Sequence, residues 1–170
     1  DRKAPVTLIE YAAPSCPVCA HFNSDTFPLL KKNYIDTGKV FYVFRMFPLR
    51  SDDGAAEKLA RCLPEDKYFS FIDLLFRTQP KWDVEYAPEN PALQSPEGVH
   101  AGLVLLARIA GMSAEQADKC MMNTKEDETI NKVASDGEAQ YSISATPTLI
   151  VDGVAQTPGF IPYEDLKKTL

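Results

Sequence analysis

A pair of cysteines separated by two residues most constrains what this chain can fold into. The pair lies in residues 15–19 (SCPVC) and follows residues 6–11 (VTLIEY). Residues 6–11 form a nearly continuous apolar run with β-branched and aromatic side chains, which predicts a strand covered on both faces. Pro17 suits the first turn of a helix, where its missing N–H costs nothing, so residues 17–34 are predicted to be helical with a bend or a restart at Pro28. The sequence therefore places a dithiol where a strand ends and a helix begins.

The remaining strand signals complete an α/β pattern around this dithiol. Residues 40–45 predict a second strand, and the helical connection before it implies a parallel, right-handed β-α-β unit. Strand character returns at residues 148–151. The dipeptide Asp152-Gly153 predicts a tight hairpin to residues 155–157, and residues 162–170 predict a closing helix. The order is β-α-β, then helices, then β-β-α.

The segment between the second and third predicted strands is mostly helical and too long for a loop. We therefore predict an inserted helical subdomain at residues 52–126. Residues 1–51 and 127–170 then form the domain that carries the dithiol.

Composition excludes several classes of function. The chain has 24 acidic and 18 basic residues, for a net charge of -6, and no basic stripe that would bind nucleic acid. No apolar run approaches the roughly 20 residues that cross a bilayer. The sequence opens on Asp1-Arg2-Lys3 without a leader, so we expect a mature or trimmed form of an exported protein. The even number of cysteines, 4, favours an oxidising compartment.

Three features together resemble a known family. They are the CPVC motif at residues 16–19, the ATPT motif at residues 145–148 before the last hairpin, and the helical insertion. The chain resembles the DsbA-like thiol:disulfide oxidoreductases of bacterial cell envelopes, in the thioredoxin superfamily. The sequence segments at residues 8–11 and 43–48 are similar to those of alphaproteobacterial members of this family, some of which carry a second cysteine pair. The resemblance implies an α/β thioredoxin fold with a helical insertion between the second and third core strands.

The two cysteines of the motif are expected to have different roles. Only a thiolate attacks a disulfide, and the N-terminus of a helix stabilises a thiolate through its unpaired N–H groups and its dipole. Cys16, at the start of the helix, is therefore the predicted attacking, solvent-facing thiol, and Cys19 is the predicted resolving thiol. Pro17 and Val18 lie between them and set the oxidising strength. Family members often have histidine at the position of Val18, so we expect this protein to be a weaker oxidant than those relatives.

The Thr146-Pro147 pair is the second predicted functional feature. The resemblance implies that this peptide bond is cis and that the proline packs against the dithiol. The residue before the proline then offers backbone groups to an extended substrate, a form of β-augmentation. Many oxidising members have valine there, whereas Thr146 can place a hydroxyl near the sulfur atoms. Thr146 therefore also favours a milder redox potential.

Glu10, Cys62 and Cys120 are assigned from the resemblance, and Arg45 is assigned from its position in the neighbouring predicted strand. Glu10 occupies the position of an acid beneath the active site and is predicted to accept the proton of Cys19, unless it is an ordinary strand-edge glutamate. Arg45, at the end of the next strand, is a candidate partner of Glu10. The family counterparts of Cys62 and Cys120 form a disulfide. We expect a structural bridge, with a second redox couple or two buried thiols as alternatives.

A zinc site and an inert structural disulfide are the two alternative interpretations of the dithiol. Cys16, Cys19 and His21 superficially resemble ligands, but zinc normally needs four. The remaining candidates, Cys62, Cys120 and His100, lie at no recognisable ligand spacing. We therefore predict a redox dithiol with no metal and no dissociable cofactor.

The predicted function is a periplasmic thiol:disulfide oxidoreductase that introduces disulfide bonds into secreted proteins. The implied partners are reduced, unfolded secreted proteins and a DsbB-like membrane oxidase, and we expect a monomer that binds no nucleic acid. A disulfide isomerase or reductase of milder potential is the alternative that Val18 and Thr146 support. A more distant alternative is a metal- or peptide-binding protein that uses the fold without turnover.

Overall fold

The computed structural model describes residues 2–170 and divides into two compact units. Of the described residues, one unit comprises 2–47 and 131–170, and the other comprises 48–130. From the sequence we predicted these boundaries after residue 51 and before residue 127. In the structure they lie a few residues away, after residue 47 and before residue 131.

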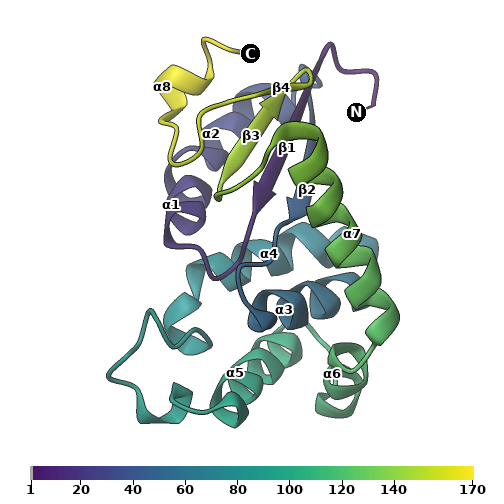
Figure 1. Cartoon of the computed structure of the whole chain (residues 1–170), viewed down its shortest axis with the longest axis vertical. Helices are drawn as coiled ribbons and strands as arrows, with labels where there is room; N and C mark the ends of the chain where they lie inside the picture. The colour runs from purple at the N-terminus through teal and green to yellow at the C-terminus, as the bar shows by residue number, and fades with distance from the viewer. Residues whose placement is uncertain (1) are drawn as a thin grey trace. The chain divides into compact units, whose positions relative to one another are not determined.

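The first unit contains a mixed four-stranded sheet in the order β2-β1-β3-β4 (Figure 1). Its strands are β1 (Val6–Ala12), β2 (Val40–Met46), β3 (Thr148–Val151) and β4 (Val154–Ala155). β1 pairs in parallel with β2 and antiparallel with β3, and β3 pairs antiparallel with β4. The central position of β1 places the residues that follow it at the middle of one sheet edge.

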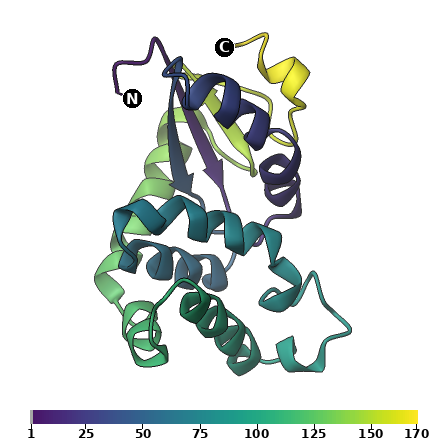
Figure 2. The same cartoon turned by 180° about the vertical axis from the view of Figure 1, so that it is seen from behind.

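Helices cover both faces of this sheet, which explains the apolar strands (Figures 1 and 2). Helices α1 (Pro17–Asp25) and α2 (Phe27–Leu30) cover the face that carries Leu8, which packs in a cluster with Phe22 and Leu30. The part of α7 (Thr124–Tyr141) in this unit covers the opposite face. Side chains alternate along a strand, so Glu10 faces α1 with Leu8, whereas the next residue faces α7.

Tyr11, the residue after Glu10, explains why α7 has a glycine at position 137. A Cβ atom on Gly137 would lie 2.5 Å from Cε1 of Tyr11. Only glycine fits this close approach between the helix and the buried ring. Tyr11 also packs in a cluster with Val133 and Tyr141 of α7, so the helix is fixed against the sheet by specific side chains.

Three predicted elements have different bounds in the structure. The helix predicted to continue to residue 34 is interrupted at Thr26, restarts as α2 with Pro28 in its first turn, and continues as a π-helical turn over Lys31–Ile35. The fourth strand contains Val154–Ala155 rather than residues 155–157, and Pro158 beyond it has no N–H to continue the ladder. The closing helix α8 is short, Tyr163–Leu166.

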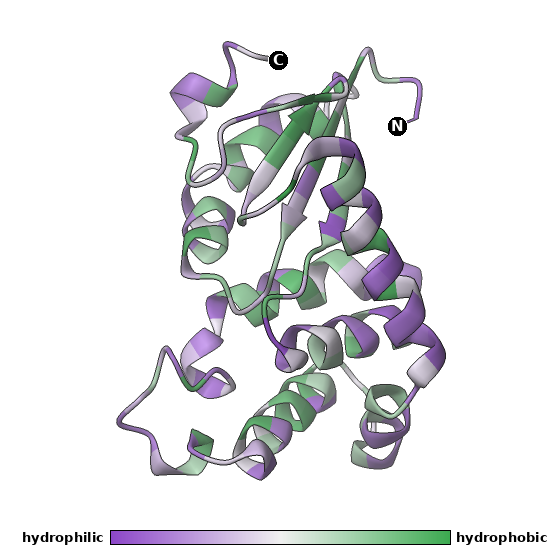
Figure 3. Ribbon diagram, viewed as in Figure 1, coloured by the Kyte–Doolittle hydropathy of each residue, from purple (hydrophilic) through white to green (hydrophobic). Residues whose placement is uncertain are grey.

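The second unit is helical. It contains α3 (Ser51–Cys62), α4 (Tyr68–Arg77), α5 (Pro96–Ile109), α6 (Ala114–Met121) and the first part of α7, with 3-10 turns at Glu65–Lys67, Gln79–Lys81 and Pro91–Leu93. Figure 3 shows the mixture of polar and apolar residues along these helices, which is expected when one face of each helix is buried. Among residues 2–170, no helix has both the length and the apolar character needed to cross a bilayer.

Candidate active site

Cys16 is the N-cap residue of α1. Its backbone is extended, with φ -77° and ψ 122°, and its Sγ accepts a hydrogen bond from the backbone N–H of Cys19 at 3.2 Å. The N–H of Cys16 donates to the carbonyl of Ala13 at 3.0 Å, which closes the turn between β1 and the helix. Pro17 occupies the first turn of α1. The positive end of the helix therefore lies at the Cys16 sulfur, as the sequence predicted.

The surroundings of Cys16 favour its thiolate. The pKa of Cys16 is lowered to about 6, first by a hydrogen bond from the thiol of Cys19, and also by the Thr146 side chain and the backbone N–H groups of Cys19 and Val18. Burial opposes these effects and raises the pKa. At neutral pH most Cys16 side chains are therefore thiolates, which is the form that exchanges with disulfides.

Cys19 has the opposite character. Its side chain is fully buried, and burial raises its pKa well above the ordinary thiol range; the hydrogen bond to Cys16 and the negative charge of that thiolate raise it further. Cys16 itself is only 4% exposed, so the prediction that it faces solvent was wrong. Part of the reason is tertiary, because its sulfur lies against the Thr146 carbonyl.

Thr146 and Pro147 lie beside the dithiol and are joined by a cis peptide bond. The Cys16 thiol donates to the Thr146 carbonyl, with Sγ and O 3.4 Å apart. The Thr146 hydroxyl is buried and has no hydrogen-bond partner in the dithiol form. It is a donor available to the Cys16 sulfur once this is deprotonated, in accord with its lowering of the pKa of Cys16. The hydroxyl thus stabilises the Cys16 thiolate and favours a more oxidising disulfide, which runs against the milder potential expected of Thr146 from the sequence.

Glu10 is a buried carboxyl group on the same side of the sheet. One of its oxygens, Oε2, accepts a hydrogen bond from the hydroxyl of Tyr42 at 2.5 Å, and the other, Oε1, is buried without a partner. Burial is the main cause that raises the pKa of Glu10 to about 7; the Tyr42 bond lowers it and the charge of Cys16 raises it. The charge of Glu10 in turn raises the pKa of Cys19. Glu10 is therefore poised to exchange a proton near neutral pH.

The partner proposed for Glu10 from the sequence was wrong. Arg45 pairs in register with Tyr11, on the sheet face that α7 covers, and lines a pocket there with Val133 and Tyr141. Glu10 faces the other side. The partner that the sequence missed is Tyr42, which the parallel register aligns with Leu8, two residues before Glu10 and on its face of the sheet. The alternation of side chains along each strand could have indicated this pairing. It also required the β1–β2 register, which shows that Tyr42 and Glu10 share a face of the sheet.

Replacing Glu10 by glutamine should stabilise the reduced protein at alkaline pH but not at acidic pH. The pKa of Glu10 is raised from 4.5 to about 7, so the folded state holds the proton more tightly than the unfolded chain. This tighter proton binding contributes to the free energy of unfolding. The contribution is fully present below pH 4.5 and is lost as pH rises through about 7. We expect the Glu10→Gln variant to gain up to about 3 kcal/mol of unfolding free energy at pH of about 8. Urea unfolding at both pH values measures it.

The matched control is Glu138→Gln, at an exposed glutamate on α7 of the same unit. It should change the unfolding free energy little at either pH. A Glu10→Gln effect that is equal at pH of about 4 and about 8 would show that burial does not suppress the ionisation of Glu10.

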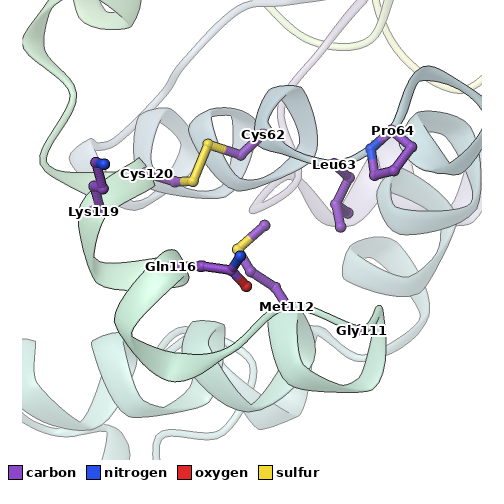
Figure 4. A pocket seen from close by; sticks show the side chains of 8 residues that line it. All are labelled: Cys62, Leu63, Pro64, Gly111, Met112, Gln116, Lys119 and Cys120. Carbon is purple, nitrogen blue, oxygen red and sulfur yellow. A yellow bond between two sulfur atoms is a disulfide. The ribbon is translucent and has the colours of Figure 1, made fainter.

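Cys62 and Cys120 form a disulfide within the second unit, with an S–S distance of 1.99 Å and a sequence separation of 58. The bridge joins the last residue of α3 to α6. It lines one side of a pocket of about 240 Å³, and Met112 and Gln116 lie on the other side (Figure 4). The disulfide is therefore at a surface that small reductants can reach.

His21, considered as a zinc ligand from the sequence, has other contacts. Its Nε2 lies 3.0 Å from Oδ2 of Asp25, and its ring stacks on Phe160. Within residues 2–170, no three histidine, cysteine, aspartate or glutamate side chains gather in an arrangement that could hold a metal ion.

A family model described as "Thioredoxin" matches residues 1–170. The chain belongs to the thioredoxin family. Among solved structures, alpha-DsbA1 of Wolbachia pipientis is similar with a TM-score of 0.82 and 28% identity, over 99% of this chain and 85% of that chain. BdbD of Bacillus subtilis in its oxidised form is similar with a TM-score of 0.78 and 28% identity, over 99% of this chain and 87% of that one. The predicted thioredoxin fold and DsbA-like resemblance are confirmed.

Curated relatives carry names in the same class. "Disulfide bond formation protein D" of Bacillus subtilis is 27% identical over 177 aligned positions, and the match covers 98% of this chain and 72% of that protein. A "Putative protein-disulfide oxidoreductase" of Rickettsia bellii is 30% identical over 155 residues, which cover 91% of this chain and 56% of that protein. The chain thus spans about half the length of its rickettsial relatives.

Proposed function

We propose that this protein is a thiol:disulfide oxidoreductase that introduces disulfide bonds into exported proteins. One observation carries the proposal. Cys16 is at the N-terminus of α1 with its pKa lowered to about 6, and its partner Cys19 is buried with a raised pKa. This asymmetry is what dithiol–disulfide exchange requires, and the names of the DsbA and disulfide-oxidoreductase relatives support it.

The reaction follows from the two thiols. In the oxidised protein, a substrate thiolate attacks Cys16 of the Cys16–Cys19 disulfide. The S–S bond breaks, a mixed disulfide forms, and Cys19 leaves with the electron pair. Because the pKa of Cys19 is raised, it takes up a proton, and Glu10, with its pKa of about 7, is the proposed donor.

A second substrate thiolate then attacks the substrate sulfur of the mixed disulfide. A substrate disulfide forms and Cys16 leaves as a stabilised thiolate, so two electrons pass from the substrate to the protein. The lowered pKa of Cys16 makes it a good leaving group and makes the disulfide form oxidising. In the opposite direction, when Cys19 attacks a mixed disulfide, Glu10 accepts its proton.

Pro17, Val18, Thr146 and Pro147 form the proposed contact surface for substrate around Cys16. Val18 is 37% exposed and supplies neither a charge nor a hydrogen-bond donor from its side chain. The Thr146 backbone is proposed to pair with an extended segment of a reduced, unfolded protein. We propose the periplasm as the location and a DsbB-like membrane oxidase as the protein that reoxidises the dithiol, with the chain acting as a monomer.

A milder reductase or isomerase is the second candidate function. Val18 favours it, because an apolar side chain there adds nothing to the stabilisation of the Cys16 thiolate. The direction of electron flow depends on how strongly the reduced form is stabilised.

Two measurements test the proposed function. The oxidised protein should speed the recovery of activity by a reduced, unfolded protein above the rate in glutathione buffer alone. The equilibrium constant of Cys16–Cys19 with glutathione should lie on the oxidising side, and Val18→His should make it more oxidising because a histidine adds positive charge near the Cys16 sulfur. Absence of any acceleration would contradict the proposal. An equilibrium on the reducing side would favour the reductase or isomerase.

A further inference from the structure

Residues 159–161, which follow β4, form hydrogen bonds with both parts of the proposed active site, the Thr146-Pro147 loop and helix α1. The backbone N–H of Gly159 donates to the carbonyl of Pro147 at 2.8 Å. Two residues later, the carbonyl of Ile161 accepts from the hydroxyl of Thr26, the buried residue that ends α1, also at 2.8 Å. Gly159 has φ of +115°, a backbone conformation that favours glycine, so the sequence fixes the position of this turn.

The residue between these two bonds, Phe160, stacks on a side chain of α1. Its ring lies parallel to that of His21, with the centroids 3.9 Å apart and an angle of 4° between the planes. His21 lies two residues after Cys19, and its Nε2 contacts Asp25 one turn further along α1 at 3.0 Å. The stack therefore connects α1, the helix that carries the dithiol, to Phe160, the residue after Gly159.

The contacts form a continuous connection from α1 back to the Cys16 sulfur. His21 holds Phe160, the neighbouring Gly159 holds the Pro147 carbonyl, and the adjoining Thr146 carbonyl accepts from Cys16 at 3.4 Å. Thr146 and Pro147 belong to a short loop before β3, so a shift of the Pro147 carbonyl displaces Thr146 as well. The loop is thus connected to a surface stack that lies outside the dithiol.

We propose that His21 is a positioning residue, whose stack on Phe160 holds the Thr146-Pro147 loop against Cys16 in the geometry that receives substrate. The proposal rests on the proposed function, because it assigns His21 a part in substrate contact at the same dithiol. His21 does not touch the reacting atoms; it acts through Phe160 and the Gly159–Pro147 hydrogen bond.

The test compares two substitutions of His21. His21→Ala removes the stacked ring, and His21→Phe keeps a ring but loses the contact with Asp25. The side chain of His21 is 53% exposed, so both variants leave the core intact. His100→Ala is the matched control, since His100 is also a half-exposed helical histidine beside an aspartate, Asp118, at 2.9 Å, but lies in the other unit.

Two readouts separate positioning from a purely structural role. Titration of thiolate absorbance in the reduced protein gives the pKa of Cys16, and steady-state kinetics with a reduced two-cysteine peptide give KM and kcat separately. We expect His21→Ala to raise the pKa of Cys16 by about half a unit, because the Thr146 hydroxyl is held less firmly near the sulfur, and to raise KM about threefold with a smaller change in kcat. His21→Phe should restore both values, and His100→Ala should change neither.

The proposal is overturned if His21→Ala keeps the wild-type pKa of Cys16 and the wild-type KM. It is equally overturned if His21→Phe is as impaired as His21→Ala, because the stack would then not be the cause. A wild-type protein that transfers no disulfides contradicts the proposed function instead. In that case the Cys16 titrations of the two His21 variants still decide whether the stack positions the loop.

Discussion

Replacing Cys16 by serine should reduce disulfide transfer to the uncatalysed background, whereas replacing Cys19 by serine should preserve the first step and trap it. The difference follows from the two pKa values. Cys16 has its pKa lowered to about 6 and is the thiolate that exchanges with substrate, whereas Cys19 is fully buried and has a raised pKa. Without Cys19, nothing within the protein attacks the mixed disulfide.

Mixed-disulfide trapping measures this asymmetry. The reduced variants are incubated with a substrate peptide activated as a mixed disulfide, and the covalent adduct is quantified by mass spectrometry. Cys19→Ser should accumulate the adduct at Cys16, and Cys16→Ser should form little at the buried Cys19. Oxidative refolding of a reduced protein should be lost in both variants.

The same experiment separates an enzyme from a binding protein of the same fold. A peptide-binding protein without turnover would keep its affinity for an unfolded protein when Cys16 is serine, and its wild-type form would show no catalysed refolding. Comparable adducts in the two variants would contradict the assignment of Cys16 as the attacking thiol.

Removal of the second disulfide should destabilise the helical unit strongly. Cys62 and Cys120 are 58 residues apart in sequence, and closing a loop of this length contributes about 4 kcal/mol in the chain-entropy model. We therefore expect the Cys62→Ala/Cys120→Ala variant to lose about 4 kcal/mol of unfolding free energy from the unit formed by residues 48–130. Urea unfolding without reductant, followed by circular dichroism because this unit is helical, measures the loss.

The experiment needs a background in which the active-site dithiol does not contribute. Both proteins are therefore prepared with Cys16 and Cys19 replaced by serine. Dithiothreitol should lower the stability of the protein that keeps the bridge to that of the alanine variant, and should leave the variant unchanged. The bridge lines an open pocket, which gives the reductant access (Figure 4).

Two other results would favour the alternatives for this pair. A loss of less than about 1 kcal/mol would argue against a structural bridge. With Cys16 and Cys19 present, a shift of their glutathione equilibrium on removal of the bridge would favour a second redox couple.

The sequence by itself determined the elements whose signals are local. The apolar run before Cys16 and Pro17 after it are enough to place a strand and then a helix, because neighbouring residues fix both. The turn at Asp152-Gly153 is of the same kind, with both residues at positive φ. The length of the helical segment also required an insertion, since no loop of that size is common.

Only the tertiary structure decided the environment of each functional side chain. The burial of Cys16, the hydroxyl of Tyr42 on Glu10 and the stack of His21 on Phe160 all join segments that lie apart in the chain. Such contacts depend on strand register and on which face of the sheet each residue occupies, as the wrong pairing of Glu10 with Arg45 shows. The CPVC motif identifies the reacting atoms, but their pKa values come from desolvation and hydrogen bonds that only the folded chain provides.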